Sequence, residues 1–323
     1  MLESMRIAMV VLVVLMLATP MRAQQSNSNA IVRAFQLWRG GQPKAAIAIL
    51  EPLLQAGARF DDAIDPGVGW NILGHSYLDL DKYAEARQAL QHALEILRPI
   101  PSVRGQYAST LDSMGMREAA LGQRDAAKAL CAKARGIYVE LGNPAGVSIT
   151  STNLAVIALD RNDFKGARRS LQNALEEAKH ATAMRDDDVA AMDAVKSALA
   201  LHDRKGEEAV STAQEAIDLW TRAHGPGYFM LANGYLLRAQ ALANSGDYGR
   251  AIRDAQHALA IAEVAVGRNT IDFLSAEAVY ARVLRASGAK REASRMTKEA
   301  SSALVNLERR QCSSCTIDAS GFR

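Results

Sequence analysis

The chain repeats one unit of about 40 residues seven times. Measured from the stretch Gly67–Pro101, the units begin near Asn27, Gly67, Ala108, Ser148, Ala190, Ala232 and Leu274. Successive starts lie 40 to 42 residues apart. A repeat of this size forms one small structural unit that cannot bury its apolar face alone, so neighbouring copies must stack. The repetition therefore predicts one elongated array in this 323-residue chain.

Small residues recur at fixed positions of the unit. The eighth position holds Ala34, Gly74, Gly115, Ala155, Ser197, Ala239 and Ala281, and the twentieth holds Ala46, Ala86, Ala127, Ala167, Ala209, Ala251 and Ala293. The twenty-seventh holds Leu53, Ala93, Ala134, Ala174, Ala216, Ala258 and Ala300. Only a small side chain lets two crossing helices approach to about 8–10 Å. Each unit is therefore predicted to be two antiparallel helices of roughly 15 residues.

The turn between the two helices is also regular. Its residues are Gly41, Asp81, Gly122, Asn162, Arg204, Gly246 and Gly288. Gly and Asn tolerate the left-handed conformation that ends a helix. Arg204 departs from this pattern and Gly206 follows it, so the fifth unit is expected to have a different turn.

The second unit carries Trp70, Leu73-Gly74, Tyr77, Ala86 and Ala93 at the key positions of a known repeat. With these residues the chain resembles the tetratricopeptide-repeat family from about residue 27 to residue 310. Its spacing is similar to that of the long-repeat subclass found in kinesin light chains and in many bacterial proteins. The resemblance implies an all-α, right-handed superhelix over residues 24–310. About seven helix pairs are expected, over residues 27–60, 67–100, 108–141, 148–181, 190–223, 232–265 and 274–307.

The N-terminus has the pattern of a secretory signal. Arg6 precedes the apolar run Ile7–Ala18, and Ala23 offers a small residue for cleavage before a polar stretch. The twelve apolar residues are too few for a membrane anchor, which needs about 20. Residues 1–23 are therefore predicted to be a signal peptide, and the mature chain a periplasmic or secreted bacterial protein with no stable membrane insertion.

Composition and motifs argue against several functions. The formal charge of +3, with acidic and basic residues interspersed, does not favour nucleic acid as a partner. None of the six histidines belongs to an HExxH pair, and no GxSxG elbow or P-loop occurs. We therefore expect no enzyme activity, no metal and no cofactor.

The three cysteines divide into one internal residue and a pair near the end. Cys131 takes a position where other units carry Leu, so it is expected to be a small buried apolar residue. Cys312 and Cys315 form a C-S-S-C motif in the tail 311–323, which is expected to be irregular. A local disulfide is the simplest interpretation in an exported protein. Redox or intermolecular pairing stays open, and zinc would need two more ligands.

The resemblance also implies where a partner would bind. In this family the first helices line a concave groove, and the residues predicted to face it here include Phe35, Trp38, Asn71, His75, Asn153, Asn233, Gln240 and Arg282. Amide side chains both donate and accept, so they can hold the backbone of an extended peptide. Phe35 and Trp38 have an alternative role in packing against the second unit. The acidic run Asp186–Asp188 is interpreted as the favourable start of a helix rather than as a binding patch.

The sequence as a whole predicts an exported scaffold that binds a peptide or protein segment in its groove. The alternatives are an assembly factor acting through its convex face or by self-association, and a sensory domain without its effector. The sequence leaves the partner, the oligomeric state and the binding face open.

Overall fold

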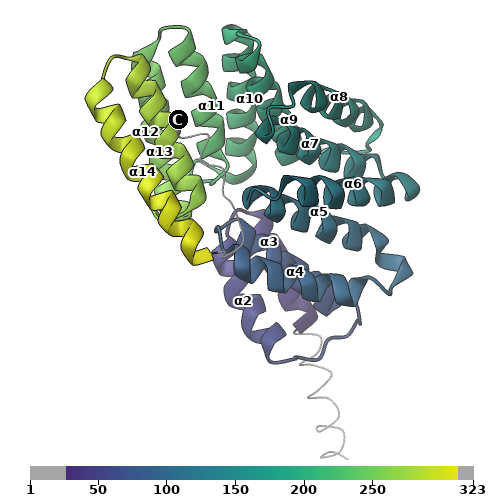
Figure 1. Cartoon of the computed structure of the whole chain (residues 1–323). Coiled ribbons are helices and arrows are strands. Elements are labelled where there is room, and N and C mark those ends of the chain that lie inside the picture. Colours follow the sequence, from purple (N-terminus) through teal and green to yellow (C-terminus); the bar gives the residue numbers. More distant parts are fainter. Residues whose placement is uncertain (1–26, 312–323) are drawn as a thin grey trace, which may run out of the picture.

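The computed structural model describes residues 27–311, and its helices follow one another in pairs (Figure 1). The seven pairs are residues 27–39 with α2 (Pro43–Gln55), α3 (Asp65–Leu78) with α4 (Tyr83–Leu97), α5 (Arg104–Ala120) with α6 (Arg124–Glu140), α7 (Pro144–Asp160) with α8 (Phe164–His180), α9 (Asp186–His202) with α10 (Gly206–His224), α11 (Leu231–Asn244) with α12 (Tyr248–Ala265), and α13 (Ile271–Ala286) with α14 (Lys290–Gln311). A short 3-10 turn, η1 (Pro101–Val103), precedes α5. The residues described contain no strand. The predicted all-α solenoid of about seven helix pairs is confirmed.

The small residues lie where the helices cross, as predicted. All seven Ala at the twentieth position are fully buried. At the eighth position of the second unit, a Cβ added to Gly74 would lie only 2.6 Å from Cγ of Leu90. Any larger residue at such a crossing would push the two helices apart, because core atoms are already close-packed.

The turns are alike in all seven units, so the expectation of a different turn at Arg204 is wrong. Arg204 has a φ of 60°, and the other six turn residues also have positive φ. The N–H of Lys205 donates to the carbonyl of Ala200 at 2.9 Å, just as Gln42 N–H donates to Leu37. These bonds satisfy the last carbonyls of the helix, and they fix the turn whichever residue occupies it. Arg204 accepts the conformation with its side chain exposed.

The helix α14 ends at Gln311, one residue into the tail that was expected to be irregular. The predicted signal peptide, Cys312 and Cys315 lie outside the described residues. Between residues 27 and 311, none of the helices combines the length and apolar character needed to cross a membrane.

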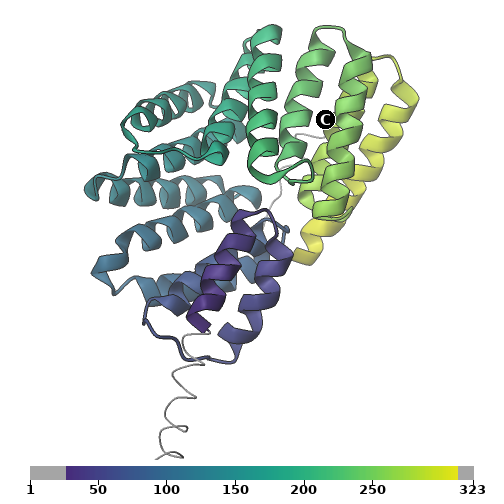
Figure 2. The same ribbon diagram turned by 180° about the vertical axis from the view of Figure 1, so that it is seen from behind.

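The stack curves so strongly that its beginning meets its end (Figures 1 and 2). The backbone N–H of Asp272, in the seventh unit, donates to Oδ2 of Asp81 in the second unit at 3.1 Å. In the first unit, a Cβ added to Gly41 would lie 2.8 Å from Cδ2 of Tyr228. The first two pairs therefore touch the last three across the interior of the curve.

Candidate peptide-binding groove

An aromatic cluster joins the first two units on the first helices of their pairs. The rings of Phe35 and Trp38 lie 5.9 Å apart, and that of Trp38 lies 4.7 Å from His75. Phe35 is 44% exposed, and the guanidinium of Arg39 stands 5.8 Å from its ring. Packing against the second unit therefore accounts for Trp38, whereas Phe35 keeps a large apolar face in contact with water.

Polar side chains connect each first helix to the next one along the stack. Trp38 Nε1 donates to Asp79 Oδ2 at 2.8 Å, and Asn153 Nδ2 donates to Asp112 Oδ2 at 2.6 Å. Between them, Ser113 Oγ lies 2.7 Å from Nε2 of His75. Each bond joins equivalent helices of neighbouring units. These hydrogen bonds therefore connect the first four units side by side.

The surroundings of these connecting side chains shift the pKa values of His75, Asp112 and Asp79. Burial lowers the pKa of His75 to about 4, so the ring is neutral at ordinary pH. The Ser113 hydroxyl donates to the carbonyl of Ser109, so its oxygen accepts from His75 and the proton lies on Nε2. Burial raises the pKa of Asp112 to about 6 and that of Asp79 to about 7; the bond from Trp38 opposes the shift of Asp79.

Asn71 differs from the other amide side chains that were predicted to face the groove. It is half-buried, and its Oδ1 is buried with no hydrogen-bond partner among the described residues. An unpartnered buried acceptor costs about 1–3 kcal/mol, which a ligand N–H would recover. Asn153, by contrast, is half-buried and its amide donates to Asp112.

The remaining predicted residues lie on the later helices. Asn233 is exposed at the start of α11, and its Nδ2 donates to the sulfur of Met230 at 3.9 Å. Gln240 donates to Leu236 within its own helix at 3.3 Å. Arg282 is half-buried in α13, and burial lowers its pKa. The structure thus brings Phe35, Trp38 and His75 into one cluster and leaves these three residues on α11 and α13.

A cleft of about 700 Å³ lies between the first helix and the fifth unit. Phe35 and Arg39 form one wall, and Arg185, Asp186 and His224 belong to the other. The acidic run does begin α9, as predicted. Asp187 has a further role, because its Oδ1 lies 2.6 Å from Nε2 of His224. No sequence feature indicated this second wall, since its residues are about 150 positions from the first.

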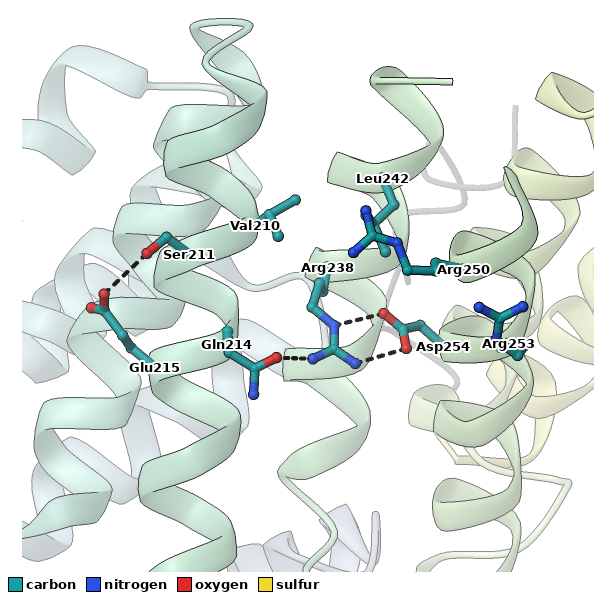
Figure 3. Close-up of a pocket in the computed structure, with 9 residues that line it drawn as sticks. All are labelled: Val210, Ser211, Gln214, Glu215, Arg238, Leu242, Arg250, Arg253 and Asp254. Atoms are coloured by element: carbon teal, nitrogen blue, oxygen red, sulfur yellow. Dashed lines mark hydrogen bonds and ion pairs between the residues drawn. The ribbon is translucent and has the colours of Figure 1, made fainter. Parts of the chain in front are cut away.

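The second helices carry a different cavity, of about 530 Å³, between α10 and α12 (Figure 3). Arg238 reaches across it and forms two bonds with Asp254, at 2.7 and 2.8 Å. It also contacts Gln214, and Arg250 pairs with Asp247. The pairs Arg238–Asp254 and Arg250–Asp247 thus neutralise part of the charge at this cavity.

The cysteine within residues 27–311 lies in the core. Cys131 is fully buried, and burial first, with Asp112 adding, raises the pKa of its thiol far above the usual range. A thiol of this kind is a poor nucleophile. Within residues 27–311 no cluster of three His, Cys, Asp or Glu could hold a metal ion.

Comparisons with known proteins point to one family. The tetratricopeptide-repeat family models match residues 69–96 and 233–272. No curated protein matches the sequence. The solved structure of a Rap protein complexed with competence and sporulation factor is similar, with 12% identity, a TM-score of 0.62, and coverage of 88% of this chain and 78% of that one.

Two further solved structures are similar over shorter or less well superimposed parts. BtubC from P. vanneervenii has 16% identity and a TM-score of 0.46, covering 76% of this chain and 91% of its own. Kinesin light chain repeats from Podosopora anserina have 14% identity and a TM-score of 0.44, covering 64% and 98%. Two separate family matches on a stack of seven like helix pairs show that the chain contains tetratricopeptide repeats.

Proposed function

We propose that the protein is an exported scaffold that binds a peptide or an extended protein segment in its concave groove. The cleft between Phe35 and the fifth unit is the observation that carries this proposal. It combines an exposed aromatic side chain with charged groups of both signs on facing walls. Aromatic anchors beside polar groups are typical of surfaces that recognise other proteins.

The fold adds support of a general kind. The Rap protein, whose structure superimposes on this chain with a TM-score of 0.62, was solved as a complex with competence and sporulation factor. At 12% identity this likeness concerns the fold, so the ligand class proposed here rests on the side chains of the groove.

The binding test compares two exposed apolar residues on opposite faces. Phe35 lies on the first helix of its pair, and Val139, which is 53% exposed, lies on the second helix of the third pair. Peptides selected from a random displayed library against the whole mature chain provide the probe. Titration against Phe35→Ala should show at least tenfold weaker binding, because an aromatic anchor is lost.

Val139→Ser is the matched control and should bind as the wild type does. Loss of binding in the Val139 variant with retention in the Phe35 variant would instead support the convex-face alternative. Sedimentation of the mature chain at several concentrations tests the remaining alternative, self-association.

Export is proposed from the residues at the N-terminus alone. Sequencing the N-terminus of the protein from its native host should give a chain that begins at Gln24. An intact Met1 on the soluble protein would contradict export.

A further inference from the structure

The two ends of the solenoid meet at a small contact, which we call the seam (Figures 1 and 2). On one side it consists of the turns 40–44 and 79–82, and on the other of the loop 225–230 and the start of α13. Asp81 and Asp272, which meet there, are 191 positions apart in the sequence. The seam therefore closes the curved stack into a ring.

Asp81 makes its contact across the seam with the first residues of α13. The backbone N–H of Asp272 donates to its Oδ2 at 3.1 Å, and the N–H of Ile271 also reaches this carboxylate. Thr270, the N-cap of α13, accepts from Phe273 and leaves these two N–H groups to Asp81. The first N–H groups of a helix have no partner inside it and carry partial positive charge, so a carboxylate is favourable there. Asp81 thus caps a helix at the other end of the chain.

The turn itself does not require an aspartate at position 81. Asn162 occupies the same turn of the fourth unit, and both residues have a φ of 56°. Asn162 is exposed, whereas Asp81 is 4% exposed and its Oδ1 accepts from the Tyr83 hydroxyl at 2.6 Å. A buried carboxylate is costly unless it is hydrogen-bonded. The donors of Tyr83 and of α13 therefore account for the burial of Asp81 at the seam.

A second contact of the seam requires a glycine. A Cβ added to Gly41 would lie 2.8 Å from Cδ2 of the Tyr228 ring, and Gly41 has a φ of 71°. The equivalent Gly246 of the sixth unit has a φ of 82° and open space around it. The close approach of a ring is therefore particular to the turn of the first unit. A larger residue at position 41 would hold the two ends apart, because packed atoms cannot overlap.

The seam positions the two walls of the cleft beside Phe35. Phe35 and Arg39 come just before the turn 40–44, and His224 comes just before the loop 225–230, so each wall adjoins one side of the seam. The Tyr228 ring packs on His224, with ring centroids 4.0 Å apart, and so links the seam to the second wall. Separation of the ends would therefore pull this cleft of about 700 Å³ apart.

We propose that Asp81 is a positioning residue that closes the solenoid into a ring by capping α13, and that the closed ring is the form that binds ligand in the cleft beside Phe35. The second part rests on the proposed function, because its ligand is the peptide assigned to the groove there. A peptide in the cleft contacts both walls, so it binds the closed ring better than an open solenoid and in turn stabilises the ring.

Small-angle X-ray scattering of the whole mature chain without peptide tests the closure of the ring. Asp81→Gly removes the carboxylate and keeps the turn, because glycine occupies this turn in four other units. Its radius of gyration should exceed that of the wild type, while far-UV circular dichroism stays the same. Asn162→Gly is the matched control, because it makes the same kind of change at the same φ away from the seam. It should keep the wild-type radius.

A second variant opens the seam from its other contact. Gly41→Arg places a side chain against the Tyr228 ring and should also increase the radius of gyration. Gly246→Arg puts the same side chain in an equivalent turn with open surroundings, so it should stay as compact as the wild type. Wild-type radii for both Asp81→Gly and Gly41→Arg would overturn closure of the ring by the seam.

Titration of the library-selected peptide tests whether the ring is the binding form. Asp81→Gly should bind it severalfold more weakly than the wild type, and Asn162→Gly should bind it equally well. An enlarged Asp81→Gly with an unchanged Kd would overturn the link between the ring and the cleft. Unchanged binding by Phe35→Ala would instead contradict the groove as the peptide site, and with it that link. The scattering results decide closure of the ring in either case, because no peptide is present.

Discussion

The indole Nε1 of Trp38 donates to Oδ2 of Asp79 at 2.8 Å, which ties the first helix of the solenoid to the second unit. The Asp79 side chain is half-buried, so the hydrogen bond from Trp38 stabilises its carboxyl group away from water. Trp38→Phe keeps an aromatic ring but leaves the carboxyl group without its partner. The free energy of unfolding should fall by about 1–3 kcal/mol in urea titrations.

Trp70→Phe controls for the smaller ring. Trp70 is also half-buried and packs against His92, with ring centroids 4.7 Å apart, but its indole N–H donates to no group between residues 27 and 311. Equal losses in the two variants would show that the bond to Asp79 contributes nothing.

The turn at Arg204 provides a second prediction. A non-glycine residue in the left-handed region costs about 1–2 kcal/mol, and glycine avoids most of that cost while adding entropy to the unfolded chain. Arg204→Gly should therefore raise the free energy of unfolding by about 0.5–1 kcal/mol. The reverse change, Gly246→Arg, places the same side chain in an equivalent turn with φ 82° and open surroundings. It should destabilise the protein. In thermal unfolding, Arg204→Gly should therefore raise the midpoint temperature and Gly246→Arg should lower it.

These examples show what could and could not be predicted from the sequence. The columns of Ala and Gly indicated the number of helix pairs and their crossings, because close packing depends on residues within one unit. The turn at Arg204 could not be predicted from its residue, because backbone hydrogen bonds determine the conformation there.

The contacts of the candidate site residues could be predicted only in part, for a related reason. Trp38 and His75 were correctly placed on the first helices, but their partners Asp79 and Ser113 depend on how neighbouring units are aligned. The bond between Asp81 and Asp272 depends on small rotations summed over five units, for which no sequence motif exists.

His75 gives the groove a pH dependence of stability that can be measured. Its folded pKa of about 4 is below the ordinary 6.5, so below about pH 6.5 the unfolded chain binds a proton that the folded chain does not. Stability is therefore lost as pH falls from about 6.5 towards 4. The variant His75→Gln has no imidazole to titrate. The amount by which its free energy of unfolding falls below that of the wild type should therefore shrink by on the order of 1 kcal/mol between pH 7 and pH 5. The variant His92→Gln, which changes an exposed histidine, is the matched control.

The cysteines should differ in reactivity. Cys131 is fully buried, so it should resist alkylation in the native protein and react after denaturation. Cys312 and Cys315 are predicted to be joined in the exported protein, so neither should react without a reductant. Mass spectrometry after alkylation separates the cases; alkylation of both tail cysteines in the native, unreduced protein would exclude the disulfide.

Asn71 offers the most direct test of the groove as the binding site. Its Oδ1 has no hydrogen-bond partner among the described residues, so replacing it removes no hydrogen bond of that oxygen within the protein. Asn71→Ala should weaken a library-selected peptide by about 0.5–1.5 kcal/mol, a few-fold to about tenfold in Kd, with little change in the urea midpoint. Asn153→Ala should instead lower the urea midpoint, because it leaves the buried Asp112 without its donor. The decisive measurement is the Kd of the selected peptide for the wild type and for Asn71→Ala by titration calorimetry. A severalfold increase in Kd is predicted, and an unchanged Kd would contradict binding in the concave groove.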